Sequence, residues 1–178
     1  MRTRQSPLPL LWLLSDERNE AVLEEALARL PRGSGFVYRH YHLGERERQA
    51  RFYSLSAVAR SCGHTVVLSG PGALAREWGA DGIYGASGNP GSEADLLQLA
   101  TAHDAAEVQA ACEAGAHGIF LSPVFATRSH PGGATLGAMG FHVLAQQSPV
   151  PVIALGGMTA DRARMLGWPR WGAIDGLA

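Results

Sequence analysis

The chain has 178 residues, of which 46% are hydrophobic and 17% are charged, and its formal net charge is −1. This length is enough for one domain with a sizeable core, so we expect a single globular domain over 1–178. The near-neutral charge gives no reason to expect nucleic acid or a membrane surface as a partner. It leaves the oligomeric state open, a homo-oligomer included.

Neither the apolar runs nor the cysteines indicate export or a metal centre. No run is long enough to span a bilayer, and residues 8–14 lack the cleavage site that follows a signal peptide. Cys62 and Cys112 are far apart and form no CxxC pair, so we expect neither a metal site nor a redox motif from them. A reducing, cytoplasmic location is the default expectation.

Strand-like apolar runs alternate with segments of helical periodicity along the whole chain. In chain order we expect strand 8–14, helix 20–30, strand 35–39, helix 49–61, strand 65–68, helix 72–78, strands 82–84 and 96–102, helix 105–114, strand 118–124, helix 140–147, strand 150–155, helix 160–166 and strand 171–177. Asp104, with Glu107 three residues later, is typical of a capping box, and Thr159 is placed to cap the last helix.

About eight strands in βαβ alternation predict an α/β fold, a closed (β/α)8 TIM barrel. Such barrels typically need ~250 residues. We therefore expect a compact version, shortened at the C-terminus, whose final helix is missing. In this fold functional groups lie at the C-terminal ends of the strands, which limits the search for a site to a few segments.

Gly156 and Gly157 follow the buried strand 150–155, and a helix begins shortly after them. Glycines let backbone amides approach a ligand closely, and free N–H groups at a helix start favour phosphate. This segment therefore predicts a phosphate site, and the alternative is a tight turn without a ligand.

The segment 122–133 is a long strand-end loop that carries Thr127, Arg128, Ser129 and His130. Such a loop can fold over an anionic ligand, because Arg128 supplies charge and the two hydroxyls supply hydrogen bonds. The alternative is a solvated surface loop.

The residues around Arg39 read Tyr38-Arg39-His40-Tyr41-His42. Alternation along a strand places Arg39 and Tyr41 on one side and the other three on the opposite side. An arginine pointing into the mouth of a barrel suits a diphosphate or a carboxylate. No carboxylate or cysteine nearby completes a ligand set for the two histidines, so we expect no metal there.

Thr101 and His103 stand at the end of the strand expected over 96–102. A histidine at this position is a candidate proton carrier, and the alternative is a structural histidine.

These motifs, in this order, resemble the thiamine phosphate synthase family and its close relative, the thiazole tautomerase TenI. The resemblance covers almost the whole chain and rests on residues 12–16, Arg39, 79–82, 101–103, 122–129 and 153–159. It implies a transferase of thiamine biosynthesis that joins a hydroxymethylpyrimidine diphosphate to a thiazole phosphate and releases pyrophosphate.

The resemblance also implies roles for residues of this chain. Gly156 and Gly157 would hold the thiazole phosphate. The candidates for the diphosphate and substrate site are Arg39, Thr101, Thr127, Arg128 and Ser129, and the candidate catalytic residues are Arg39, His103 and His130.

The chain departs from the family at the metal site. The family binds Mg²⁺ through aspartates after the third and fourth strands, where this chain has Ser69-Gly70 and the segment 84–88 without a carboxylate. We therefore assign no metal ligand. The family's last loop and helix, which add amides to the phosphate site, are also expected to be absent.

Two other functions stay open. One is a barrel that has lost catalysis and binds a phosphorylated thiazole or thiamine-type ligand. The other is a TenI-like isomerase that uses His103 or His130 as a proton carrier, although the histidine of the TenI loop is Pro123 here.

Overall fold

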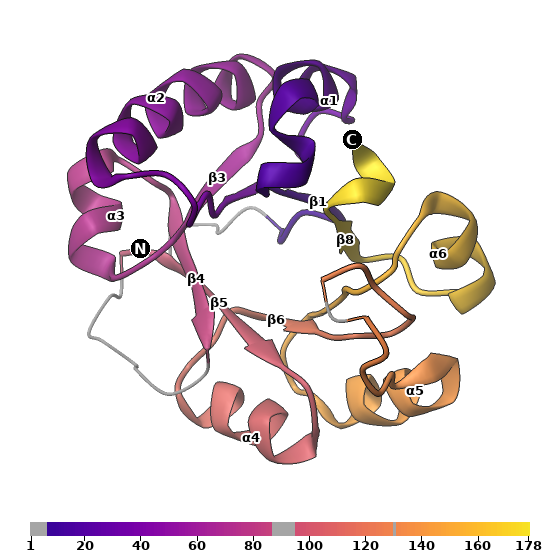
Figure 1. Cartoon of the computed structure of the whole chain (residues 1–178). Helices are drawn as coiled ribbons and strands as arrows, with labels where there is room; N and C mark the ends of the chain where they lie inside the picture. Colours follow the sequence, from indigo (N-terminus) through magenta and orange to yellow (C-terminus); the bar gives the residue numbers. More distant parts are fainter. Residues whose placement is uncertain (1–6, 87–94, 130) are drawn as a thin grey trace.

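A computed structural model describes residues 7–86, 95–129 and 131–178. Eight parallel strands pair in sequence order, and β8 returns to β1 through Leu11 opposite Trp171, so the barrel is closed (Figure 1). The strands are Leu11–Leu14 (β1), Gly35–Tyr38 (β2), Thr65–Ser69 (β3), Gly82–Ala86 (β4), Leu97–Ala102 (β5), Gly118–Leu121 (β6), Val152–Ala154 (β7) and Trp171–Ala173 (β8). The predicted (β/α)8 barrel is confirmed.

The helices surround the barrel on its outside (Figure 1). They are Leu23–Arg29 (α1), Glu45–Ser61 (α2), Gly72–Trp78 (α3), Ala105–Glu113 (α4), Gly137–Gln147 (α5) and Ala160–Leu166 (α6), with two 3₁₀ turns at Glu17–Val22 (η1) and Asp175–Leu177 (η2). Within the part of the chain that the structure describes, no helix combines the length and apolar character needed to cross a bilayer.

The interior of the barrel is filled by side chains from alternate strand positions. This inner cluster consists of Trp12, Leu14, Val37, Val67, Leu99, Phe120 and Ile153, all of them buried. Trp12 is the largest, and its ring meets Phe120 edge-on at 5.7 Å between centroids. Gly35 on β2 makes room for it, because a Cβ there would overlap the Trp12 ring.

The opposite strand faces pack against the helices in two further clusters. One joins β1–β3 to α1–α3 and includes Phe36, Tyr38 and Phe52, and the other joins β5–β7 to α4–α6 and includes Phe141. The strands are therefore buried on both faces, as expected for a parallel barrel.

The expected caps are present where the sequence places them. The Asp104 carboxylate accepts the Glu107 N–H at 2.9 Å, and the Thr159 hydroxyl accepts the Arg162 N–H at 3.2 Å. The return contact of the first cap differs slightly, since Glu107 accepts the backbone N–H of His103 instead of that of Asp104.

Among the elements whose bounds differ from the prediction, two strands end early and enlarge the loops at the barrel mouth. β6 ends at Leu121 instead of residue 124, and β8 ends at Ala173, so residues 174–177 form a loop and the η2 turn rather than a strand. The helix expected over 20–30 begins with η1.

Candidate active site

A cavity of about 810 Å³ opens at the C-terminal ends of the strands. Its wall is formed by β4, by the end of β5 and by the loops that follow β1, β2 and β5 to β8. It is lined by all eight predicted site residues that the structure describes, namely Arg39, Thr101, His103, Thr127, Arg128, Ser129, Gly156 and Gly157. The ninth, His130, lies outside the described residues.

The turn after β7 adopts a backbone that favours glycine. Gly156 and Gly157 have φ angles of +95° and +61°, and a Cβ on Gly156 would lie 2.6 Å from the Cα of Pro123. The Gly156 carbonyl accepts the N–H of Phe125 at 3.1 Å, which fastens the turn to the loop after β6. Within the described residues neither glycine N–H has a hydrogen-bond partner, so both remain available to a ligand.

The turn after β8 lies against the turn after β7. Ile174, Asp175 and Gly176 line the cavity, and Gly176 approaches the carbonyl of Met158 so closely that a side chain would not fit. The sequence pattern predicted a strand over 171–177, so it did not predict that residues 174–176 line the cavity. The start of the η2 turn therefore forms part of the cavity wall beside the turn after β7.

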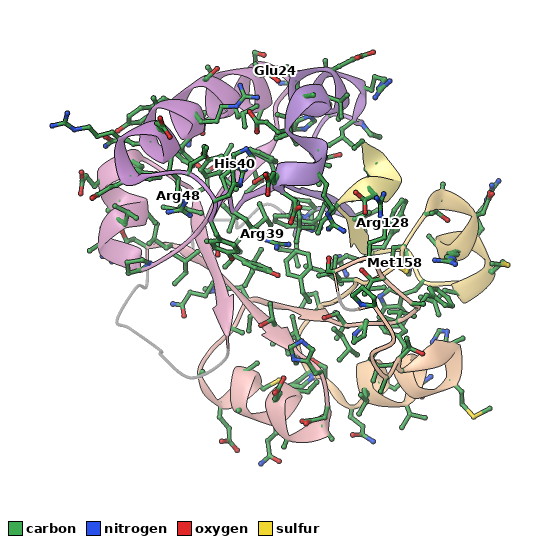
Figure 2. All side chains as sticks on the ribbon, viewed as in Figure 1. Glu24, Arg39, His40, Arg48, Arg128 and Met158 are labelled. Carbon is green, nitrogen blue, oxygen red and sulfur yellow. The ribbon has the colours of Figure 1, made fainter. Side chains whose placement is uncertain are left out.

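Arg39 and Tyr41 both line the cavity, on the side of the chain that alternation predicted. The Arg39 guanidinium lies 5.4 Å from the Tyr41 ring centroid and 3.4 Å from the Asp16 carboxylate. Its Nε is buried and has no hydrogen-bond partner in the described structure. Figure 2 shows Arg39 toward the middle of the barrel, with Arg128 on the side of β8 and α6.

A buried polar network holds the backbone of Arg39. The Arg39 N–H donates to Ser15 Oγ at 2.7 Å, Ser15 Oγ lies 2.8 Å from Nδ1 of His40, and Nε2 of His40 contacts Glu20. Burial lowers the pKa of His40, and the hydrogen bond that its ring donates to Glu20 opposes this only in part. His40 is therefore neutral at neutral pH, and its imidazole bridges Ser15 to Glu20.

Arg18 is a site residue that sequence reasoning missed. Its Nε donates to Asp16 at 2.9 Å, its Nη2 donates to Ser129 Oγ at 2.9 Å, and its Nη1 lies 3.4 Å from Asp175. Arg18 therefore joins the ends of β1, β6 and β8 across the mouth. Its contact with Ser129 spans 111 residues, which no local sequence signal reveals.

Arg162 was also missed, because in the sequence it looks like any polar residue in the first turn of a helix, here α6. Its guanidinium donates to the Gly157 carbonyl and lies 5.2 Å from the Phe125 ring centroid. It lines the cavity beside the glycine turn and adds positive charge there.

The remaining predicted residues lie around the rim. In the loop after β6, the Thr127 hydroxyl accepts the Ser129 N–H at 3.2 Å, and Arg128 is exposed. His103 is 56% exposed, and its Nδ1 is 2.8 Å from Glu107.

Of the two positions where the family carries aspartates, the structure describes the one at Ser69-Gly70, and the end of the segment 84–88 lies outside the described residues. The donors around Ser69 do not suit a divalent cation. The Ser69 hydroxyl is 2.5 Å from the Tyr41 hydroxyl, and its carbonyl accepts the cationic Arg48 at 2.7 Å. Tyr84 packs against Phe120, and desolvation raises its pKa to about 12. No group of three or more His, Cys, Asp or Glu side chains gathers anywhere in the described residues.

The carboxylates beside the cavity are already paired with arginines. Burial tends to raise the pKa of Asp16, but hydrogen bonds from Arg18 and the charges of Arg18 and Arg39 outweigh it and hold that pKa below its usual value. Asp175 contacts the same Arg18 guanidinium. Mg²⁺ usually requires one or two carboxylates besides substrate oxygens, and both carboxylates that the described residues place at this mouth, Asp16 and Asp175, are paired with arginine.

The fold and the site define a (β/α)8-barrel protein with a cationic cavity at the C-terminal ends of its strands. Residues 11–167 match the family described as thiamine monophosphate synthase. The chain belongs to this family.

Individual relatives agree with this assignment. Thiamine-phosphate synthase of Geobacillus thermodenitrificans, a transferase, is 25% identical over 170 residues, which cover 88% of this chain and 77% of the relative. The solved structure of thiamine phosphate pyrophosphorylase from Pyrococcus furiosus has a TM-score of 0.77 at 21% identity, over 92% of this chain and 84% of that one. The YdjI aldolase from Escherichia coli shares only the barrel, with a TM-score of 0.63 at 10% identity over 94% and 75% of the two chains.

Proposed function

We propose that this chain binds the phosphate group of a thiazole phosphate or thiamine phosphate at the turns after β7 and β8. The observation that carries the proposal is the pair of Gly156 and Gly157 amides at the cavity wall, which have no hydrogen-bond partner among the residues that the structure describes, with Gly176 beside them. Many (β/α)8 barrels bind phosphate with the loops after their seventh and eighth strands. Arg162 adds a cation to the same wall.

Calorimetry with thiazole phosphate and with thiamine phosphate tests this function. We expect saturable binding of at least one of them. In Gly156→Ala the new Cβ would push against Pro123, and the left-handed backbone would be strained, so the affinity should fall by about tenfold or more.

Gly167→Ala is the matched control. Gly167 also has a positive φ, +64°, but it ends α6, and a Cβ there would have no neighbour within 4 Å. We expect a loss of about 1 kcal/mol in stability and unchanged affinity. Flat titrations of the unchanged protein with both phosphates would contradict the proposed function.

Transfer chemistry is the second candidate, favoured by family membership and by Arg39 in the same cavity. In that reaction the bond between the pyrimidine methylene and the diphosphate breaks, the thiazole nitrogen takes its place, and pyrophosphate leaves. Arg39 and Arg128 would stabilise the leaving charge, while Thr101, Thr127 and Ser129 would orient the substrates. This assignment of roles is part of the proposal.

The assay supplies hydroxymethylpyrimidine diphosphate, thiazole phosphate and Mg²⁺ to the purified protein. Formation of thiamine phosphate is expected, and Arg39→Gln should slow it by ~100-fold or more. No product at high protein concentration would contradict the transferase and leave the binding function standing.

The tautomerase alternative rests on a proton carrier. His103 lines the rim of the cavity, so His103→Ala should abolish any isomerisation of a thiazole phosphate that the protein catalyses. Unchanged turnover in this variant and in His130→Ala would remove the alternative.

A further inference from the structure

Building on the proposed function, we propose that the cavity binds a diphosphate group without a divalent cation, through the guanidinium groups of Arg18 and Arg39. The ligand class is a diphosphate ester or free pyrophosphate. The inference starts from the mismatch between the family's metal positions and the donors present here.

Arg18 is held across the mouth of the barrel by contacts from three strand ends. It is held by Asp16 after β1, by Ser129 in the loop after β6 and by Asp175 after β8, so three strand ends determine its position. Hydrogen bonds to Asp16 and Ser129 take two of the five N–H donors that a guanidinium carries. Nη1 lies 3.4 Å from Asp175, so an anion in the cavity that Arg18 lines would share Nη1 with Asp175 and take the second hydrogen of Nη2.

Arg39 has a donor that the protein itself does not satisfy. Its Nε is buried without a partner among the described residues, and such a donor is costly unless a ligand or water accepts it. Its Nη2 reaches the Asp16 carboxylate that also holds Arg18, so one aspartate orients both guanidinium groups. Two planar forks oriented in this way suit the oxygens of a diphosphate.

The charge of the cavity favours the same ligand. Among the described residues of the wall, four are arginines, namely Arg18, Arg39, Arg128 and Arg162, and Asp175 is the one carboxylate. Arg48 adds a further cation at the end of β3, where it donates to the Ser69 carbonyl. These guanidinium groups supply the positive charge that a metal would otherwise bring.

Calorimetry with inorganic pyrophosphate, once in EDTA and once with Mg²⁺, tests the inference on the full chain. We expect saturable binding in EDTA, with a Kd within about threefold of the value with Mg²⁺. Binding that appears only with Mg²⁺, or that Mg²⁺ strengthens by about tenfold or more, would overturn the inference.

Arg18→Gln should weaken pyrophosphate binding in EDTA by about tenfold or more, because it removes a charged donor. Arg29→Gln is the matched control, since Arg29 is 59% exposed and pairs with Glu25 on α1. It should bind as the unchanged protein does. Equal affinities of the two variants would overturn the role of Arg18.

Arg39→Gln keeps the inference testable if Arg18→Gln fails to fold. It removes the other guanidinium group, so pyrophosphate binding in EDTA should weaken by about tenfold or more, and unchanged affinity would contradict the inference. Different results would contradict the proposed function and this inference. A protein that binds thiazole phosphate but no pyrophosphate in EDTA contradicts only this inference, whereas one that binds neither thiazole phosphate nor thiamine phosphate contradicts the proposed function.

Discussion

His40 connects the buried network under the mouth to Arg39. Its φ of +42° is in the left-handed region, which costs a residue other than glycine energy unless the surroundings hold it there. Here Ser15 and Glu20 bind both ring nitrogens, and Tyr38 stacks on the ring at 4.7 Å between centroids. The position of the Arg39 backbone therefore depends on an imidazole that faces no substrate.

This network predicts a pH dependence of stability. Burial lowers the pKa of His40 in the fold below its unfolded value of 6.5, so the unfolded chain binds more protons as the pH falls. The contribution of neutral His40 to the free energy of unfolding is constant above pH 6.5 and declines as the pH falls below that value. It is fully lost below the pKa of His40 in the folded protein. Urea unfolding from pH 5 to 8 should show a smaller loss in His40→Asn, because asparagine tolerates a left-handed backbone without titrating. Equal pH profiles for both proteins would contradict this.

At the scale of the elements, the close contact between β1 and β2 depends on Gly35, which has no side chain. Trp12 on β1 occupies the space that a Cβ at this position would need. The barrel interior thus accommodates one large ring by pairing it with a glycine.

We expect Gly35→Ala to lower the free energy of unfolding by about 1–3 kcal/mol or more, as overpacking of a tight core does. Gly85→Ala is its control, because Gly85 lies on β4 and a Cβ there would meet nothing within 4 Å. Urea unfolding of the two variants measures the difference. A Gly35→Ala protein as stable as the control would contradict the packing described for Trp12.

Most of the strands and helix caps could be predicted from the sequence alone. Apolar runs and periodicity predicted the eight strands, because each strand is buried on both faces and its hydrophobic pattern is local. The caps at Asp104 and Thr159 were predictable for the same reason. The end of β8 was not, since residues 174–177 are apolar enough to continue a strand and turn only where Gly176 meets Met158.

The candidate site was predictable only in part. Arg39, Gly156 and Gly157 stand directly at strand ends, so the barrel rule places them at the mouth. Arg18 and Arg162 lie within a turn and a helix, and their place in the cavity depends on contacts with Ser129 and Phe125 from distant loops. Periodicity carries no information about such contacts.

For the whole molecule, the family assignment and the site together describe a thiamine monophosphate synthase barrel with an altered mouth. The scaffold matches the family, whereas Arg48 donates to the carbonyl of Ser69, one of the positions where the family carries a carboxylate. The proposed phosphate binding depends on the turns after β7 and β8, and the proposed transfer chemistry depends on Arg39 and Arg128 across the same cavity.

A crystal structure of the protein with bound thiazole phosphate tests the central claim most directly. The account predicts phosphate oxygens within about 2.7–3.2 Å of the amide nitrogens of Gly156 and Gly157, with the η2 turn against the same group. A phosphate bound elsewhere in the cavity, with both glycine amides facing water, would contradict it.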